Sequence, residues 1–155
     1  LPGINEILEI GRGRIIKEGK QVAVLNFGAR LEECKKASEI LLKRGIDISI
    51  IDARFAKPLD EKLIIETATS HEVIITIEEG SIGGFGSHVM QLLSDRGIFD
   101  RGLKFRSMIL PDTFIDQDSP EKMYDKAGLN SQSIVNKIEQ TLSSKVVFAK
   151  SKNKI

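Results

Sequence analysis

A short stretch in the middle of the chain combines residue types that build ligand sites in many α/β proteins. The apolar run at residues 73–77 predicts a buried strand, and two carboxylates, Glu78 and Glu79, follow it directly. A glycine-rich loop at residues 80–86 comes next, and a helical pattern starts after it. A strand, a glycine loop and a helix in this order can form a binding or docking site at the carboxyl end of the strand.

The two carboxylates are adjacent, which limits what they can do together. Neighbouring residues on a strand point to opposite faces, so Glu78 and Glu79 would not meet on one reacting group. Acid–base catalysis by a pair of carboxylates needs both groups beside the same bond. We therefore expect one of them to cap the loop or to contact another chain, and we favour a structural or interface role over a catalytic one.

The glycine loop, which includes Gly83, Gly84 and Gly86, could present backbone N–H groups to an anion at the start of the following helix. It lacks the Gly-Lys-Ser/Thr ending of a P-loop and the G-x-G-x-x-G pattern of a dinucleotide site. Glycines also let a chain turn sharply and let a helix pack closely against a sheet. The sequence favours this second, structural role for the loop.

Three nitrogen-bearing side chains remain as candidate ligand contacts. Arg54 and Lys57 follow a predicted strand at residues 46–51 and could bind a phosphate or a carboxylate, although we favour surface ion pairing. His88 lies one turn into the helix after the glycine loop and could face a neighbouring domain. One cysteine and two histidines are too few for a dedicated zinc site, so we expect no bound metal.

Composition narrows the class of protein. The 155 residues and the hydrophobic fraction of 41% suit one domain with one core. The chain has 23 basic against 22 acidic residues, so we expect no nucleic acid and no membrane surface as a partner. The single cysteine, Cys34, falls at apolar spacing in a predicted helix, and we expect a buried thiol in a cytoplasmic protein. The chain starts at Leu1, which suggests a fragment or a processed product.

The apolar pattern predicts alternating strands and helices. Strands are predicted at residues 7–17, 21–27, 46–51, 73–77 and 103–110. Helices are predicted at residues 31–44, after an Asp60 cap, at residues 87–94, after a Ser119 cap, and at residues 131–142. This alternation favours a mostly parallel sheet with helices on both faces. We divide the chain into one domain, residues 1–142, and a basic, loosely ordered tail, residues 143–155.

Four segments together resemble one family. They are GRGRIIKEG at residues 11–19, DARFAKPLD at 52–60, ITIEEGSIGGFGSHV at 75–89 and LPDTFIDQDSPEKMYDKAGLN at 110–130. In this order and spacing they look like the C-terminal domain of 1-deoxy-D-xylulose-5-phosphate synthase. The glycine motif alone is less specific, because transketolases and the β subunits of 2-oxoacid dehydrogenases carry related versions.

The resemblance implies a fold and an activity for the whole enzyme. The fold would be a three-layer α/β/α sandwich around a five-stranded mixed sheet, mostly parallel, with residues 7–16 as one antiparallel edge strand. The enzyme would be a cytoplasmic homodimer that condenses pyruvate with glyceraldehyde 3-phosphate and releases carbon dioxide. Its product supplies isoprenoid, thiamine and pyridoxal biosynthesis. Thiamine diphosphate and magnesium would be held by two domains that precede this one.

No catalytic, cofactor-binding or metal-binding residue can be carried over to this chain, because the family's magnesium motif and the residues that act on the thiamine ring have no counterpart in it. We therefore expect neither cofactor to be bound to this chain alone. The implied partners are the upstream domains of the same enzyme and a second subunit. Positions retained for packing or anion binding are Arg54, Lys57, Glu78, Glu79, Gly83, Gly84, Gly86 and His88.

Two other functions stay open on the sequence. The chain could be a regulatory module that binds a phosphorylated metabolite through Arg54, Lys57 and the glycine loop. It could also be the C-terminal docking domain of a 2-oxoacid dehydrogenase β subunit, which would bind an acyltransferase core. The segment at residues 110–130 fits the synthase better than this docking domain.

Overall fold

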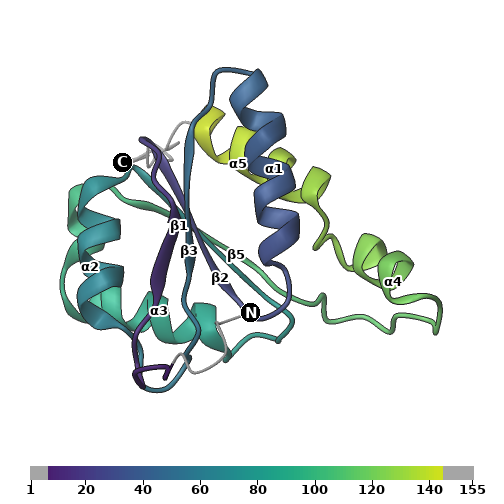
Figure 1. Ribbon diagram of the computed structural model, residues 1–155, viewed down its shortest axis with the longest axis horizontal. Helices are drawn as coiled ribbons and strands as arrows, with labels where there is room; N and C mark the ends of the chain where they lie inside the picture. Colours follow the sequence, from purple (N-terminus) through teal and green to yellow (C-terminus); the bar gives the residue numbers. More distant parts are fainter. Residues whose placement is uncertain (1–6, 145–155) are drawn as a thin grey trace, which may run out of the picture.

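The computed structural model describes residues 7–144, and these residues form a sheet of five strands with helices on both faces (Figure 1). The strand order is β1-β3-β2-β4-β5. The strands are β1 (Arg14–Lys17), β2 (Val22–Phe27), β3 (Ile48–Asp52), β4 (Val73–Glu78) and β5 (Lys104–Met108). The helices are α1 (Leu31–Lys43), α2 (Glu61–Ser70), α3 (Phe85–Asp95), α4 (Pro120–Ala127) and α5 (Ser131–Ser143), with a 3-10 turn, η1 (Ile98–Arg101), before β5.

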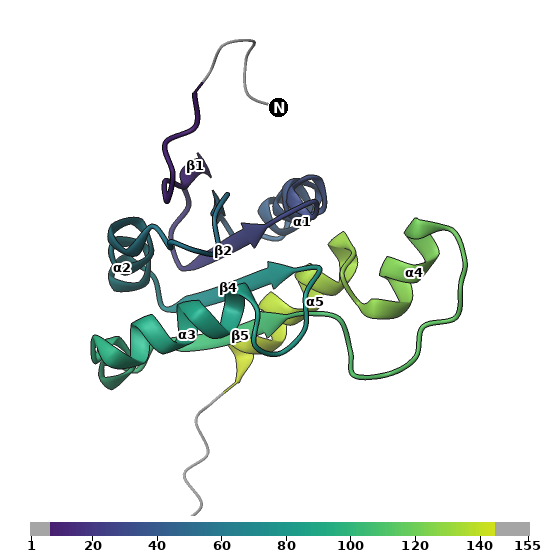
Figure 2. The same cartoon turned by 90° about the horizontal axis from the view of Figure 1, so that it is seen from below.

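The central strands β2 and β4 are apolar almost throughout because both faces of the sheet are covered. Helices α1 and α5 pack on one face, and α2 and α3 pack on the other (Figures 1 and 2). Alternate residues of each strand therefore enter two separate cores, as Ile75 and Ile74 of β4 do. The predicted three-layer fold is confirmed.

The edge strand β1 runs antiparallel to β3, and the other strand pairs are parallel. The single antiparallel edge strand implied by the resemblance is thus present. It is shorter than predicted, since the strand starts at Arg14 and not at Ile7. Gly11 adopts a φ of +74°, a left-handed conformation that is incompatible with a continuous strand.

The ends of three helices show how well capping signals predict structure. Asp60 caps α2 as predicted, because its carboxylate accepts a hydrogen bond from the N–H of Leu63 at 3.1 Å. The expected Ser119 hydroxyl cap of α4 is wrong, since that side chain makes no capping hydrogen bond. Helix α3 begins at Phe85, two residues earlier than predicted, because a carboxylate from β4 caps its first turn.

An arm, defined here as residues 111–127, extends from the carboxyl end of β5 and ends in α4 (Figures 1 and 2). Helix α4 has no buried residue. At the other end of the chain, the expected loose tail at residues 143–155 lies outside the described residues except for Ser143 and Ser144. No helix in the described residues 7–144 is long and apolar enough to cross a membrane.

The buried thiol of Cys34 yields a first prediction. Cys34 is fully buried in α1, and burial raises its pKa to about 12 from 9.0. A rise of about three pH units lowers the thiolate fraction near neutral pH by about a thousandfold. We expect a thiol reagent to modify the native chain at least that much more slowly than the urea-unfolded chain, as followed by absorbance. Equal rates would contradict burial.

Candidate functional site

The sequence-predicted residues gather at the carboxyl edge of the sheet, where parallel strands end together. Glu78 is the last residue of β4, and Glu79 begins the loop that leads to α3. The segment with Arg54 and Lys57 follows β3, the strand on the other side of β2 from β4. The structure therefore brings the glutamates and the glycine loop into one region and places Arg54 and Lys57 two strands away.

The carboxylate of Glu78 is the most constrained group in this region, with only 3% of the residue exposed. One oxygen accepts a hydrogen bond from the N–H of Phe85 at 2.9 Å, and the other accepts one from the N–H of Gly86 at 2.8 Å. Both amides belong to the first turn of α3, where N–H groups lack helical partners and the helix dipole favours negative charge. Glu78 therefore acts as an internal anion at this helix.

The glycines of the loop fit around that carboxylate. A Cβ atom on Gly80 would lie 2.6 Å from an oxygen of Glu78, and a Cβ on Gly84 would collide with the same oxygen. A Cβ on Gly86 would lie 2.6 Å from the hydroxyl of Thr76. Gly83 has a φ of +99°, a backbone conformation that residues with a side chain rarely adopt. The loop therefore encloses the chain's own carboxylate, and two of its amides are already engaged.

Glu79 lies in a second cluster, which joins the loop to the arm. Its carboxylate pairs with Arg30, and the two atoms Nε and Oε1 lie 2.8 Å apart. The guanidinium of Arg30 stacks over the ring of Tyr124 in α4, 3.5 Å from the ring centroid. A hydrogen bond to Glu79 raises the pKa of Tyr124, with burial as a further cause. This cluster attaches α4 to the body of the domain.

Arg54, Lys57 and His88 do not form one site. Arg54 has a φ of +59°, and its Nε lies 3.9 Å from a carboxylate oxygen of Asp52. Lys57 and His88 line a shallow hollow of about 300 Å³ beside α3, and Arg54 is not among its lining residues. Two carboxylates, Glu61 and Asp95, line the same hollow, which weakens its attraction for an anion.

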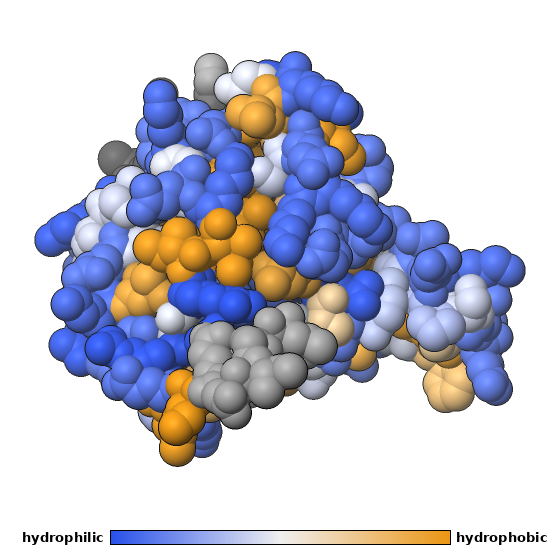
Figure 3. Space-filling model, in the orientation of Figure 1, coloured by the Kyte–Doolittle hydropathy of each residue, from blue (hydrophilic) through white to orange (hydrophobic). Residues whose placement is uncertain are grey.

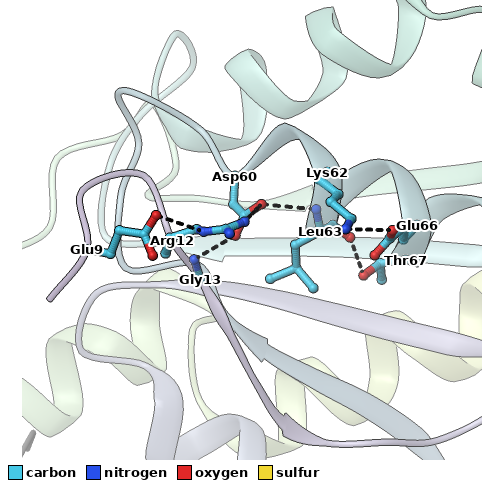
Figure 4. Close-up of polar contacts among 8 residues, drawn as sticks. All are labelled: Glu9, Arg12, Gly13, Asp60, Lys62, Leu63, Glu66 and Thr67. Carbon is cyan, nitrogen blue, oxygen red and sulfur yellow. Dashed lines mark hydrogen bonds and ion pairs between the residues drawn. The ribbon is translucent and has the colours of Figure 1, made fainter.

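A larger hollow of about 440 Å³ lies between the segment before β1 and helix α2. Asp60 lines this hollow, and Figure 4 shows its carboxylate accepting hydrogen bonds from the N–H of Gly13 at 3.0 Å and from the N–H of Leu63. Arg12 lies 4.0 Å from Asp60 and also pairs with Glu9. Because its charges pair with one another, this hollow ties residues 9–13 to α2.

Metal binding finds no support in the described part of the chain. Among residues 7–144, no three His, Cys, Asp or Glu side chains lie close enough together to hold a metal ion. Of the three aspartates of residues 110–119, Asp118 pairs with Lys122 at 3.3 Å.

Comparison with known proteins assigns the fold. Residues 11–134 match the family model of the transketolase C-terminal domain. The chain belongs to this family. The matched residues include the antiparallel edge strand β1, the glycine loop around Glu78 and the arm.

Two solved structures show the extent of the likeness. A split-gene transketolase, solved as an inactive β4 tetramer, matches with a TM-score of 0.79 at 29% identity, over 88% of this chain and 44% of that chain. A transketolase from Campylobacter jejuni matches with a TM-score of 0.61 at 15% identity, over 84% of this chain and 18% of that one, which is a likeness of fold alone. The chain thus spans less than half the length of either protein.

Sequence reasoning missed two residues of this transketolase C-terminal domain that hold the loop and the arm together. Arg30 lies directly before α1, and Tyr124 is the single tyrosine of the chain, 94 positions later. No spacing rule connects positions so far apart. The local signals were only a cation directly before α1 and an aromatic ring within α4, and neither indicates which residue it contacts.

The Glu78 cap yields a second prediction. A glutamine at this position has one acceptor oxygen, so in Glu78→Gln one amide of the α3 first turn faces an NH2 group. We expect a loss of about 2–3 kcal/mol in the free energy of unfolding, measured by urea denaturation. Glu72→Gln, at an exposed position outside the cap, is the matched control and should change stability little. Equal losses in both variants would contradict the cap.

The single tyrosine yields a third prediction. Because the hydrogen bond to Glu79 raises the pKa of Tyr124, Glu79→Gln should lower this pKa toward the ordinary tyrosine value. Ultraviolet absorbance titration of the tyrosinate measures it without interference, since the chain has one tyrosine and no tryptophan. Asp125→Asn, which changes the adjacent residue, should leave the titration unchanged. An unaltered titration in Glu79→Gln would show that the two side chains do not interact.

Proposed function

We propose that this chain is the C-terminal domain of a 1-deoxy-D-xylulose-5-phosphate synthase and that it performs packing, not chemistry. The observation that carries the proposal is the Glu78 carboxylate, which fills the helix N-terminus where an external anion would bind. The four motif segments support the choice of this enzyme within the thiamine-dependent transketolase group. The family and the solved relatives support the group but leave the specific enzyme to the test below.

The described residues do not fit thiamine diphosphate or its magnesium ion. The carboxylate of Glu78 is buried and engaged by two amides, so it is not placed to act on a thiamine ring. Residues 7–144 also hold no cluster of ligands for a metal. We therefore derive no step of the reaction through this chain. In the proposed enzyme, other domains hold the cofactor, and the cofactor supplies the carbanion chemistry.

The proposed partners are the upstream domains of the same enzyme and a second subunit in the cytoplasm. Two observations support these partners: the chain matches only part of a longer relative, and it exposes large apolar side chains. The chain corresponds to 44% of a relative that was solved as a tetramer. Several large apolar side chains are also exposed in loops of the described chain, among them Ile82 at 83% and Phe114 at 97%. Exposed apolar side chains of this size are candidates for contact with other domains.

A thermal unfolding experiment tests whether this chain alone binds the cofactor or a substrate of the proposed enzyme. The chain is heated alone and with thiamine diphosphate plus magnesium, with pyruvate, or with glyceraldehyde 3-phosphate. We expect no shift with any of them, because a ligand at about 100 times its dissociation constant would add about 2.7 kcal/mol. A shift with thiamine diphosphate would overturn the packing role. A shift with the sugar phosphate alone, lost in Lys57→Ala, would favour the metabolite-binding module.

A domain exchange tests the choice of enzyme. The C-terminal domain of a known 1-deoxy-D-xylulose-5-phosphate synthase is replaced by this chain, and product formation from pyruvate and glyceraldehyde 3-phosphate is measured. The same replacement is made in a transketolase as the matched comparison. We expect activity to be retained in the first chimera and reduced in the second. The reverse result would contradict the synthase, and binding of an acyltransferase core by this chain would favour the 2-oxoacid dehydrogenase alternative.

A further inference from the structure

The outer edge of strand β5 has no strand partner in the described part of the chain. β5 is the last strand of the sheet and pairs only with β4 among residues 7–144. The N–H groups of Lys104 and Leu110 point inward, where each bonds a carbonyl just outside an end of β4. Because backbone groups alternate between the two sides of a strand, the N–H and C=O groups of Phe105, Ser107 and Ile109 point outward. Such a row of outward groups is a template for a further strand.

A hollow of about 320 Å³ lies between this edge and helix α5. Residues 107–109 line it on the side of the sheet, and the junction of α4 and α5 at residues 127–129 lines one end. Polar side chains of α5 line the opposite side at helical spacings of three and four. They are Ser133, Asn136, Lys137 and Gln140. Figure 2 shows β5 as the last strand of the sheet with α5 beside it. We call this hollow, together with the outward edge of residues 105–109, the β5–α5 groove.

The unpaired charges at this groove are positive. Lys137 is the one charged side chain among the described residues that line the hollow, and it makes no ion pair within residues 7–144. Arg106 is exposed and shares a side of β5 with Met108, which packs in the core under α1 and α5. Within the described chain the guanidinium of Arg106 donates one hydrogen bond, to the carbonyl of Phe105 at 2.7 Å. Two cations without a carboxylate partner favour an acidic ligand.

The other side of the same edge is apolar. Phe105 is partly buried and packs against the core under α2 and α3. Its ring meets that of Phe99 edge-on, with the centroids 6.0 Å apart. A strand added to β5 would place its side chains alternately beside Phe105 and beside Arg106, because neighbouring side chains lie on opposite faces. The complementary segment therefore alternates apolar and acidic residues.

The opposite edge of the sheet, β1, does not offer the same chemistry. Figure 3 shows apolar side chains gathered over the middle of the face on which β1 lies. Arg14 of β1 pairs with Asp52 at 3.0 Å. Lys17 pairs with Asp47. The pairing of β1 with β3 is also irregular between Ile15 and Lys17, and such irregularities protect an edge against further pairing. An acidic strand therefore meets unpaired cations at β5 and not at β1.

We propose that the β5–α5 groove binds an extended segment of a partner polypeptide, which adds to β5 as a further strand. Its acidic side chains face Lys137 and Arg106, and its apolar side chains face Phe105. A free anion would engage the two cations but leave the outward backbone groups unpaired, so an extended segment satisfies more of the site. The inference rests on the proposed packing role and names the kind of segment that is packed.

Amide hydrogen exchange followed by NMR tests whether the edge is open. In the chain alone, the outward amide of Ser107 should exchange at least tenfold faster than the amides of Arg106 and Met108, which face β4. Similar protection of all three amides would show that the edge of β5 is already covered and would overturn the proposal.

A peptide of the required pattern tests binding. The probe is the fluorescent, capped peptide Thr-Val-Glu-Val-Glu-Val-Thr, and its dissociation constant is measured by fluorescence polarisation. We expect the acidic peptide to bind and to slow exchange of the Ser107 and Ile109 amides. The same peptide with lysine in place of glutamate should bind at least tenfold more weakly. No binding, or equal binding of the two peptides, would overturn the proposal.

Charge reversal locates the peptide on the surface. Lys137→Glu should raise the dissociation constant of the acidic peptide at least tenfold, because a like charge then faces its glutamates. Lys62→Glu makes the same change of charge at an exposed position of α2, outside the groove, and should leave binding unchanged. Equal losses in both variants would show only a response to net charge, and the groove would not be the site.

N-methylation of the peptide separates strand addition from attraction of charge. In an added strand only every second peptide N–H faces β5, so methyl groups in one register should abolish binding and those in the other should be tolerated. Equal effects in both registers, or displacement of the peptide by free glutamate at the same concentration, would mean that the groove attracts anions only. Either result would overturn the inference, whereas the domain exchange above still decides the proposed function.

Discussion

The carboxyl edge of this sheet depends on one buried negative charge. Glu78 ends the central strand β4 and places its carboxylate at the start of α3, where two backbone N–H groups bind it. Removing a carboxylate from water costs free energy that only close hydrogen bonds and the helix dipole can offset. The glycines are needed because any side chain on Gly80 or Gly84 would occupy the space of the carboxylate. A loop that looks like an anion site in sequence is therefore one whose anion is part of the chain.

The same principle extends to the rest of the edge. Arg30, Glu79 and Tyr124 form a cluster that satisfies its own charge and attaches the arm. Asp60 caps α2 and at the same time binds the backbone before β1. These groups pair with one another and thereby tie the glycine loop, α2 and the arm to the body of the domain. This organisation agrees with membership in a family of C-terminal domains whose relatives are much longer proteins.

The arm carries an exposed apolar side chain beyond the cluster of Arg30, Glu79 and Tyr124. Phe114 is 97% exposed on the arm, and its neighbours Asp112 and Asp116 make no ion pair within residues 7–144. A domain whose internal charges are largely paired, and whose arm exposes an aromatic ring, has the chemistry of a part that packs against other domains. Helix α4 of the arm has no buried residue, and the contact between Arg30 and Tyr124 attaches it to the body of the domain.

The sequence by itself determined the layers of the fold. Nearly continuous apolar runs at residues 22–27 and 73–77 favour short strands covered on both faces, and local signals such as Asp60 before α2 mark helix starts. The antiparallel edge came from the resemblance and not from periodicity, because a strand's direction leaves no mark on its own residues. The sequence predicted that Glu78 or Glu79 would cap the loop or contact another chain, and tertiary structure decided that Glu78 is the cap and that Arg30 and Tyr124 hold the arm. Their partners are 7 to 94 residues away along the chain, and only packing of the elements brings such groups within hydrogen-bonding or stacking distance.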